Sequence, residues 1–242
     1  MADIANTDRV IIGVDEFHYA KVFKDDSSAL QHGTVKRFPL TIEINVNTNS
    51  ATETLFADNQ PAIVYTTIGV VEVTMNRTNL PNEFLADALG SPVDGGIRYA
   101  TSTQTAPYVG IAWRQLYSDG TYAYVKLYKG KFSEPEHNAK TKEDGVEFQT
   151  REIMGNFVST LYKHTVSLVE FPLLMAIADE TDDGYVAEGD TWFDYIFANP
   201  VAWAQTTPYV VDDVRSYNGV VYACITNHTS TTAFAPANWV AI

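Results

Sequence analysis

Two strand-like runs enclose a long charged segment within residues 122–150. The first run alternates strictly, so three tyrosines and a lysine fall on one face and three apolar residues on the other. These residues are Tyr122, Tyr124, Lys126 and Tyr128 against Ala123, Val125 and Leu127. Gly145 precedes a second run that begins at Val146. The pattern predicts two β-strands joined by a loop that is too polar to contribute to a core.

The connecting segment, residues 133–144, is charged along most of its length. Its acidic and basic residues are Glu134, Glu136, His137, Lys140, Lys142, Glu143 and Asp144. A loop of this length without secondary structure is usually functional or disordered. We therefore interpret these seven residues as a contact surface for another molecule and not as part of a catalytic cleft.

Apolar residues alternate with polar ones in several other runs of the chain. The apolar members are Ile42, Ile44 and Val46 in the first run, Val71, Val73 and Met75 in the second, and Val109, Ile111 and Trp113 in the third. Turn signals such as Asp94-Gly95-Gly96 and Asp119-Gly120 separate runs of this kind. The sequence predicts a mainly β fold, an antiparallel β-sandwich or barrel.

One or two short helices are expected beside the sheets. Asn79 is a candidate N-cap, Pro81 follows in the first turn, and Gly90 is a stop signal. A second helix is expected within residues 185–197, although Gly189 weakens that pattern.

The net charge of −14, from 30 acidic residues against 16 lysines and arginines, argues against direct nucleic-acid binding. The longest apolar run, residues 166–178, is interrupted by Glu170 and Pro172, so no membrane span is expected. The first residues lack the pattern of a secretory signal, and we expect synthesis and assembly in a cytoplasm. Cys224 is the single cysteine, so no intramolecular disulfide forms.

No constellation of residues predicts catalysis, a metal site or a cofactor. The five histidines show no metal-ligand spacing, and the chain has neither a glycine-rich phosphate loop nor a nucleophile elbow. The nearest approach is an EF-hand-like spacing of Asp179, Thr181, Asp183, Gly184 and Asp190. Its twelfth position is aspartate in place of glutamate, and a solvated acidic turn remains the alternative to a calcium loop.

Composition changes after residue 198. Residues 199–242 contain three charged side chains but six aromatic ones, namely Trp203, Tyr209, Tyr217, Tyr222, Phe234 and Trp239. Pro200 suits a short, stiff connector. We expect one domain over residues 1–198 and a second, small one over residues 199–242.

Short blocks along residues 10–160 resemble the major tail proteins of long-tailed bacteriophages, of the phi13 type. The blocks are DEFHYA at 15–20, LFADN at 55–59, EV at 72–73, NLP at 79–81, LG at 89–90, PYV at 107–109, LYKGKF at 127–132, TKED at 141–144 and EFQT at 147–150. The resemblance implies a virion protein of the tail, a tail-tube subunit that closes into homo-hexameric rings stacked into a conduit for DNA ejection. Its implied partners are tape-measure, tail terminator and baseplate proteins.

On this interpretation, edge strands join neighbouring subunits. Residues 133–144 and 1–9 are expected to be disordered in the free monomer and to order against the next ring. DNA passes without specific binding, since acidic residues lining the lumen repel it. The alternative is that acidity only keeps the chain soluble.

The C-terminal aromatic spacing resembles small three-stranded carbohydrate-binding modules found on chitinases, with Val214 to Tyr222 as the most specific segment. Residues 223–230 depart from the chitin-binding form, which argues against chitin as the ligand, and a host cell-wall polysaccharide is the expected partner. All six aromatics are candidate glycan contacts. A module this small needs a core, so we expect Trp203, Tyr222 and Trp239 mainly inside and Tyr209, Tyr217 or Phe234 exposed.

Two alternatives stay open at this point. Instead of a phage tail subunit, the chain is a secreted carbohydrate-binding or glycan-active protein in the first alternative. In the second, it is a tube subunit of a phage-derived bacteriocin. The small module is alternatively a solubilising or spacing appendage.

Overall fold

A computed structural model describes residues 9–58, 60–141, 148–166, 168–185, 191–198 and 201–242. Strand is the dominant secondary structure, and α1 (Asn82–Leu89) is the single α-helix of these residues. The strand pairs are antiparallel, which confirms the predicted mainly β class. The chain divides into two compact units, residues 1–39, 107–129 and 159–242 in the first and residues 40–106 and 130–158 in the second. The predicted boundary at residues 199–200 lies outside the described residues and stays a prediction.

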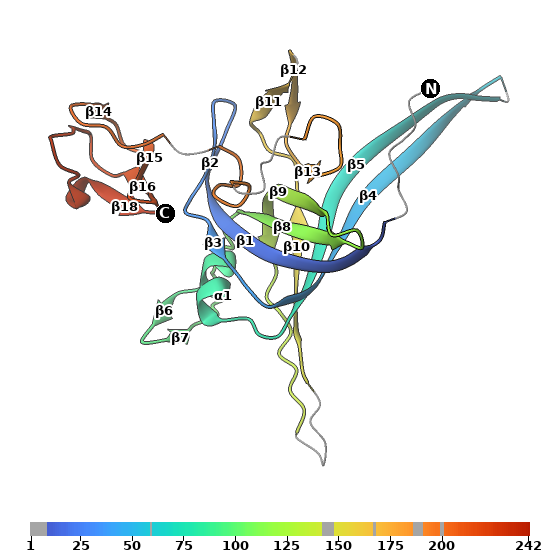
Figure 1. Cartoon of the computed structure of the whole chain (residues 1–242), viewed down its shortest axis with the longest axis horizontal. Coiled ribbons are helices and arrows are strands. Elements are labelled where there is room, and N and C mark those ends of the chain that lie inside the picture. The colour runs from blue at the N-terminus through green and yellow to red at the C-terminus, as the bar shows by residue number, and fades with distance from the viewer. Residues whose placement is uncertain (1–8, 59, 142–147, 167, 186–190, 199–200) are drawn as a thin grey trace. The chain divides into compact units, whose positions relative to one another are not determined.

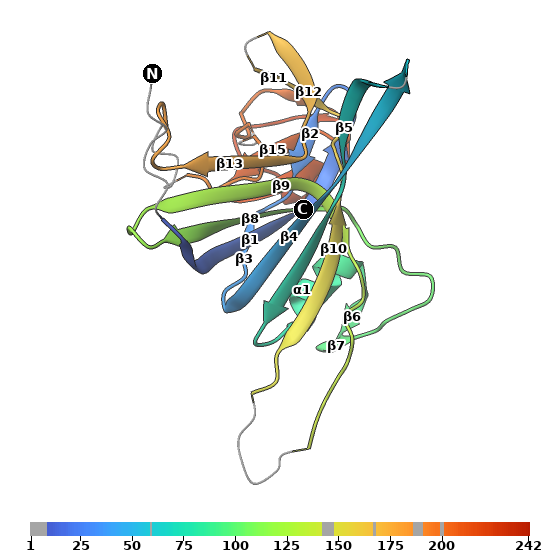
Figure 2. The same ribbon diagram turned by 90° about the vertical axis from the view of Figure 1, so that its right-hand side faces the viewer.

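The first unit is built on a sheet with the strand order β2-β1-β8-β9. Its strands are β1 (Ile11–Asp25), β2 (Leu30–His32), β8 (Val109–Tyr117) and β9 (Tyr122–Phe132). Two more strands, β3 (Lys36–Arg37) and β13 (Met175–Asp179), pair with β1 and β9. Figure 2 shows β13, β9, β8 and β1 side by side. The hairpin of β11 (Lys163–Val166) and β12 (Val169–Pro172) also belongs to this unit.

Strand β9 is buried on both of its faces. Residues 191–197 cover the tyrosine and lysine face, where Tyr124 meets Trp192 at 5.9 Å between ring centroids and Tyr128 meets Phe197 at the same distance. Lys126 donates a hydrogen bond to the Tyr195 carbonyl at 2.9 Å. Residues 191–198 form turns and bends, so the expected second helix is absent from them; residues 186–190 lie outside the described part.

The second unit contains β4 (Thr41–Ala57), β5 (Gln60–Arg77), β10 (Arg151–Phe157) and the last three residues of β9. In this unit β10 lies between β9 and β5, and β4 follows β5. Val71, Val73 and Met75 are at most 1% exposed, as their alternation predicts. In β4 the apolar face of the alternating run is less buried than expected, because Ile42 is 47% exposed.

Helix α1 covers this core with its apolar side, including Phe84, whose ring lies 5.8 Å from that of Phe132. Gly90 ends the helix in the left-handed conformation that its sequence position predicts. The helix begins later than expected, with Pro81 and not Asn79 at the N-cap. Asn79 instead accepts a hydrogen bond from the Leu80 N–H. No helix in the described part of the chain has the length and apolar character needed to cross a membrane.

The hairpin of β6 (Val93–Asp94) and β7 (Ile97–Arg98) follows α1 and carries the predicted Asp94-Gly95-Gly96 turn. Figure 1 shows the much longer hairpin of β4 and β5, which pair from Thr41 to Ala57. The loop after β9 rejoins the sheet later than predicted. Strand β10 begins at Arg151, and Phe148, placed in a strand by its sequence, is 90% exposed and outside any strand.

The C-terminal residues form a three-stranded sheet of β15 (Val214–Tyr217), β16 (Val220–Cys224) and β18 (Trp239–Ala241). A second pair, β14 (Pro208–Tyr209) with β17 (His228–Thr229), and the 3-10 turn η1 (Pro236–Asn238) complete it. This arrangement confirms the predicted three-stranded module.

Candidate functional site

The C-terminal module has a small buried centre. Tyr209, Cys224 and Trp239 are 2%, 1% and 5% exposed and form one cluster. The Tyr209 hydroxyl donates to the Ala204 carbonyl at 3.1 Å and accepts from the Ala204 N–H at 2.7 Å. Tyr209 is therefore a core residue, and its expected role as an exposed platform is wrong. The core position expected for Trp239 is confirmed.

Four aromatic side chains lie at the margin of this centre and are each partly exposed. We call Trp203, Tyr217, Tyr222 and Phe234 the aromatic cluster. Phe234 is its hub, since it stacks on Tyr217 with 4.3 Å between centroids and contacts Tyr222 at 4.9 Å. Trp203 meets Phe234 edge to face at 5.8 Å. Rings held in this way lose little freedom on binding, so their exposed parts form a pre-organised apolar surface.

The sequence predicted that some side chains of the aromatic cluster would lie in the core and others on the surface. The structure separates them less clearly. Trp203 and Tyr222 were expected inside, yet each is half-buried. Tyr217 and Phe234 were expected outside and are half-buried too. Because all four rings contact one another, each side chain serves both the packing of the module and its surface.

Comparison with known protein families finds a match within the C-terminal segment. Residues 202–240 match carbohydrate-binding module family 5/12. The matched range contains all six aromatic residues of the C-terminal segment and the whole aromatic cluster. No curated protein matches the chain. A carbohydrate-binding module is therefore indicated at the C-terminus, and the match does not extend to residues 1–201.

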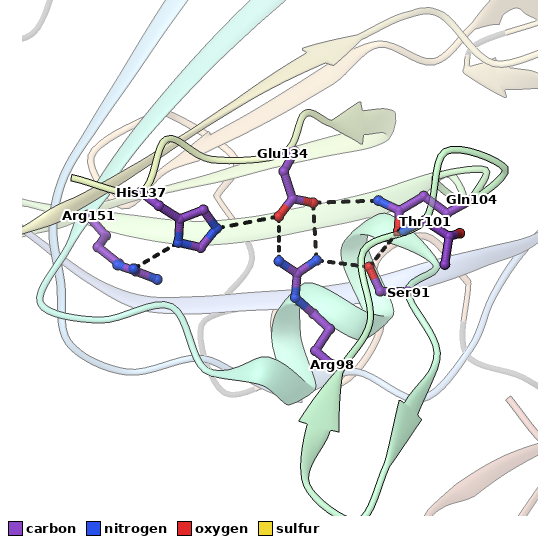
Figure 3. A network of polar contacts seen from close by, with 7 residues as sticks. All are labelled: Ser91, Arg98, Thr101, Gln104, Glu134, His137 and Arg151. Atoms are coloured by element: carbon purple, nitrogen blue, oxygen red, sulfur yellow. Dashed lines mark hydrogen bonds and ion pairs between the residues drawn. The ribbon is translucent and has the colours of Figure 1, made fainter. Parts of the chain in front are cut away.

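The root of the charged loop is a second candidate site, and Figure 3 shows its polar contacts. Arg98, in β7, donates from both terminal nitrogens to the Glu134 carboxylate, with one contact at 3.1 Å. Ser91 accepts from Arg98 at 2.9 Å and donates to Gln104 at 3.0 Å. The Arg98 side chain is 7% exposed. The hydrogen bond from Arg98 holds the pKa of Glu134 below its ordinary value.

The network continues from Glu134 across to the other limb of the loop. His137 Nε2 lies 3.7 Å from Glu134 Oε1, and Arg151 donates to His137 Nδ1 at 3.0 Å. Farther out, Gln149 accepts from the Lys140 N–H and donates to the Lys140 carbonyl. These contacts tie the two limbs together, so the root has a defined course within a single chain.

The seven residues expected in the loop contact fall into three groups. Glu134 and His137 are engaged within their own chain, contrary to the expectation that the whole loop stays free before assembly. Glu136 and Lys140 have exposed side chains. Lys142, Glu143 and Asp144 lie outside the described residues. A hollow of about 450 Å³ separates the limbs near Glu136 and Arg151.

Sequence reasoning missed the partners of Glu134. Arg98, Ser91 and Gln104 lie 36, 43 and 30 positions away along the chain, and no local pattern connects them to the loop. Their only sequence signal was the Asp94-Gly95-Gly96 turn, which predicts a hairpin ending near Arg98.

The acidic turn after β13 is held by its own chain. Asp179 accepts from Thr181 and pairs with Arg9 at 2.5 Å. Burial raises the pKa of Asp179, but the hydrogen bonds from Thr181 and Arg9 outweigh it and lower the pKa overall. A strand and not a helix precedes the turn, and Asp190 lies outside the described residues. The first residue of the calcium-like spacing is thus already neutralised, which favours the structural turn.

Proposed function

We propose that this chain is a structural subunit of a long-tailed phage tail tube and that its C-terminal module makes weak contacts with host polysaccharide. The observation that carries the proposal is the combination of a carbohydrate-binding module at residues 202–240 with a body of antiparallel strands that ends in the open edge strand β4. The ordered blocks that resemble major tail proteins support the same assignment.

Assembly into rings needs a contact between two different surfaces of the same chain, repeated around a rotation axis. Open sheet edges suit this contact, because unpaired backbone groups of one copy hydrogen-bond to a strand of the next. Six copies per ring, stacked with other rings through residues 133–144, would form the tube. The contacts of Glu134 and His137 would hold the root of that loop in the same way in every copy.

The acidic composition fits a conduit for DNA. With a net charge of −14 per chain, a ring whose lumen is lined by acidic residues would repel a polyanion that passes within the screening length of them. DNA would therefore pass without specific binding. Tape-measure, terminator and baseplate proteins would be the partners at the ends and inside of the tube, and the assembled protein would reside in the virion.

The aromatic cluster is the proposed sugar contact. Faces of aromatic rings stack on the apolar faces of sugar rings. Phe234 stacks on both Tyr217 and Trp239 and so holds the cluster together, while the partly exposed rings of Tyr217 and Trp203 beside it offer surface to a sugar. A surface of this size gives weak binding by itself. Repetition of the module along a tube raises the overall affinity by orders of magnitude without a new contact.

Size-exclusion chromatography with light scattering tests the assembly half of the proposal, and co-sedimentation with insoluble bacterial cell wall tests the sugar half. We expect rings or longer species at high protein concentration and retention on cell wall that F234A reduces. A monomer at every concentration, together with release of glycan fragments, would instead favour a secreted glycan-active protein.

A further inference from the structure

The outer part of the β4–β5 hairpin has no covering layer among the described residues. Every residue from 47 to 58 and from 60 to 70 is exposed, whereas Val71 is fully buried. We call residues 47–58 and 60–70 the arm. A two-stranded hairpin alone is marginally stable in water. A pairing of this length therefore calls for a partner that covers it.

The arm is rich in large apolar side chains. The six most exposed are Leu55, Phe56, Ile63, Val64, Tyr65 and Ile68, with exposed fractions of 61%, 66%, 58%, 63%, 68% and 65%. At these fractions the six residues present roughly 800 Å² to solvent, about one partner's share of a standard protein interface. Monomeric proteins seldom leave so much adjoining apolar surface exposed. The arm has the area of an interface and not of an ordinary loop.

Charge restricts the kind of partner that fits. Glu53 and Asp58 are the arm's only charged residues, and neither lysine nor arginine occurs in it. The arm therefore has no positive charge with which to bind a nucleic acid or an acidic protein. Two copies of a chain with a net charge of −14 repel each other electrostatically. That repulsion is weak between two arms, because each arm carries only two charged residues.

Both edges of the arm are open. Strand β10 pairs with β5 only from Val71 to Arg77, so the outer side of residues 60–70 faces no described strand. Strand β4 ends the sheet, and its outer side is open as well. The two edges run in opposite directions because the hairpin is antiparallel. Copies related by rotation therefore place β4 of one beside β5 of the next in antiparallel orientation.

We propose that the arm pairs edge to edge with the arm of a second copy of this chain, β4 of one against residues 60–70 of the other. This inference rests on the proposed assembly and assigns it to a defined segment. Each arm satisfies the open backbone of its neighbour, and the apolar side chains pack across the junction. Thr52 and Thr66 lie opposite each other across the two strands, with 3.0 Å between their hydroxyl oxygens, and place a polar pair on one face of the arm.

Two variants and one control test the proposal in the full chain. The first variant replaces residues 51–67 by Asn-Gly, which closes the hairpin just beyond the Ser50–Ile68 pair with a favoured two-residue turn. The second carries V64K and Y65K, one charge on each face of the arm. The control is L168K, which places the same charge at a residue that is 96% exposed outside the arm.

Light scattering should show that the shortened variant stays monomeric, that the double lysine variant needs about a hundredfold higher concentration to assemble, and that L168K assembles like the unmodified protein. Amide hydrogen exchange should slow at residues 60–70 on assembly of the unmodified protein. Normal assembly of both arm variants, or unchanged exchange, would overturn the arm's role and leave the proposed assembly standing. A monomeric unmodified protein would contradict the proposed assembly itself.

Discussion

Replacement of Asp25 by asparagine tests how the first unit is held together. Asp25, at the end of β1, pairs with Lys129 of β9 at 2.6 Å. Their side chains are 5% and 10% exposed. The same carboxylate accepts hydrogen bonds from the N–H groups of Leu161 and Tyr162 at 3.0 and 2.9 Å. One buried charge thus joins three segments of the chain.

D25N keeps the shape of the side chain but leaves the Lys129 ammonium without its counter-charge. Removing one partner of a buried ion pair costs about 3 to 5 kcal/mol. The asparagine oxygen still accepts from the backbone, and Lys129 lies 4.6 Å above the Tyr108 ring, so we expect a loss near the lower limit, about 3 kcal/mol. The neighbouring D26N is the matched control, because the Asp26 side chain is 46% exposed and asparagine also suits its turn.

Urea unfolding followed by circular dichroism measures the free energy of unfolding of each variant. The double variant D25N/K129M should recover part of the loss, since it removes both charges. A loss below about 1 kcal/mol in D25N, or an equal effect of D26N, would refute the reasoning.

The pH dependence provides a further check on the same pair. Burial raises the pKa of Asp25, but the hydrogen bonds from Lys129, Leu161 and Tyr162 outweigh it, so the pKa is lowered overall. A carboxylate with a lowered pKa in the folded state stabilises fully above its unfolded pKa of about 3.9 and loses that contribution as pH falls through the folded value. The difference in stability between the unmodified protein and D25N should therefore shrink below about pH 4.

Deletion of residues 136–144 should leave a folded subunit, because Glu134 and Arg98 stay paired, but electron micrographs should show no tubes; normal tubes would refute the stacking role of the loop. F234A should weaken cell-wall retention more than V240A, an exposed residue of β18 outside the aromatic cluster, and equal retention would exclude the cluster as the sugar contact. G130A should destabilise the protein by about 1 to 3 kcal/mol, since a Cβ there would lie 2.4 Å from the Phe157 ring; wild-type stability in urea would contradict that packing.

The strand pattern could be predicted where one face is buried. Val71, Val73 and Met75 alternate in sequence because one side of β5 packs into the core of its unit. The arm shows no such signal, since both its faces are exposed and apolar residues occur on each. Sequence periodicity reports burial within one chain, so a surface reserved for another molecule does not follow from it.

The second helix, expected within residues 185–197, is absent from residues 191–197, whose aromatic side chains take another course. Those side chains instead pack on the tyrosine face of β9, and the Tyr195 carbonyl accepts the hydrogen bond of Lys126. Tertiary contacts therefore override local propensity there. The burial of Tyr209 was missed for a related reason: its hydroxyl finds both a donor and an acceptor at Ala204, five residues away, which aromatic spacing does not indicate.

Electron microscopy of the purified protein at high concentration tests the central claim most directly. The account predicts rings with sixfold symmetry and hollow tubes made by stacking them, with the C-terminal modules as repeated outward projections. Uniform monomers or shapeless aggregates at the same concentration would contradict it.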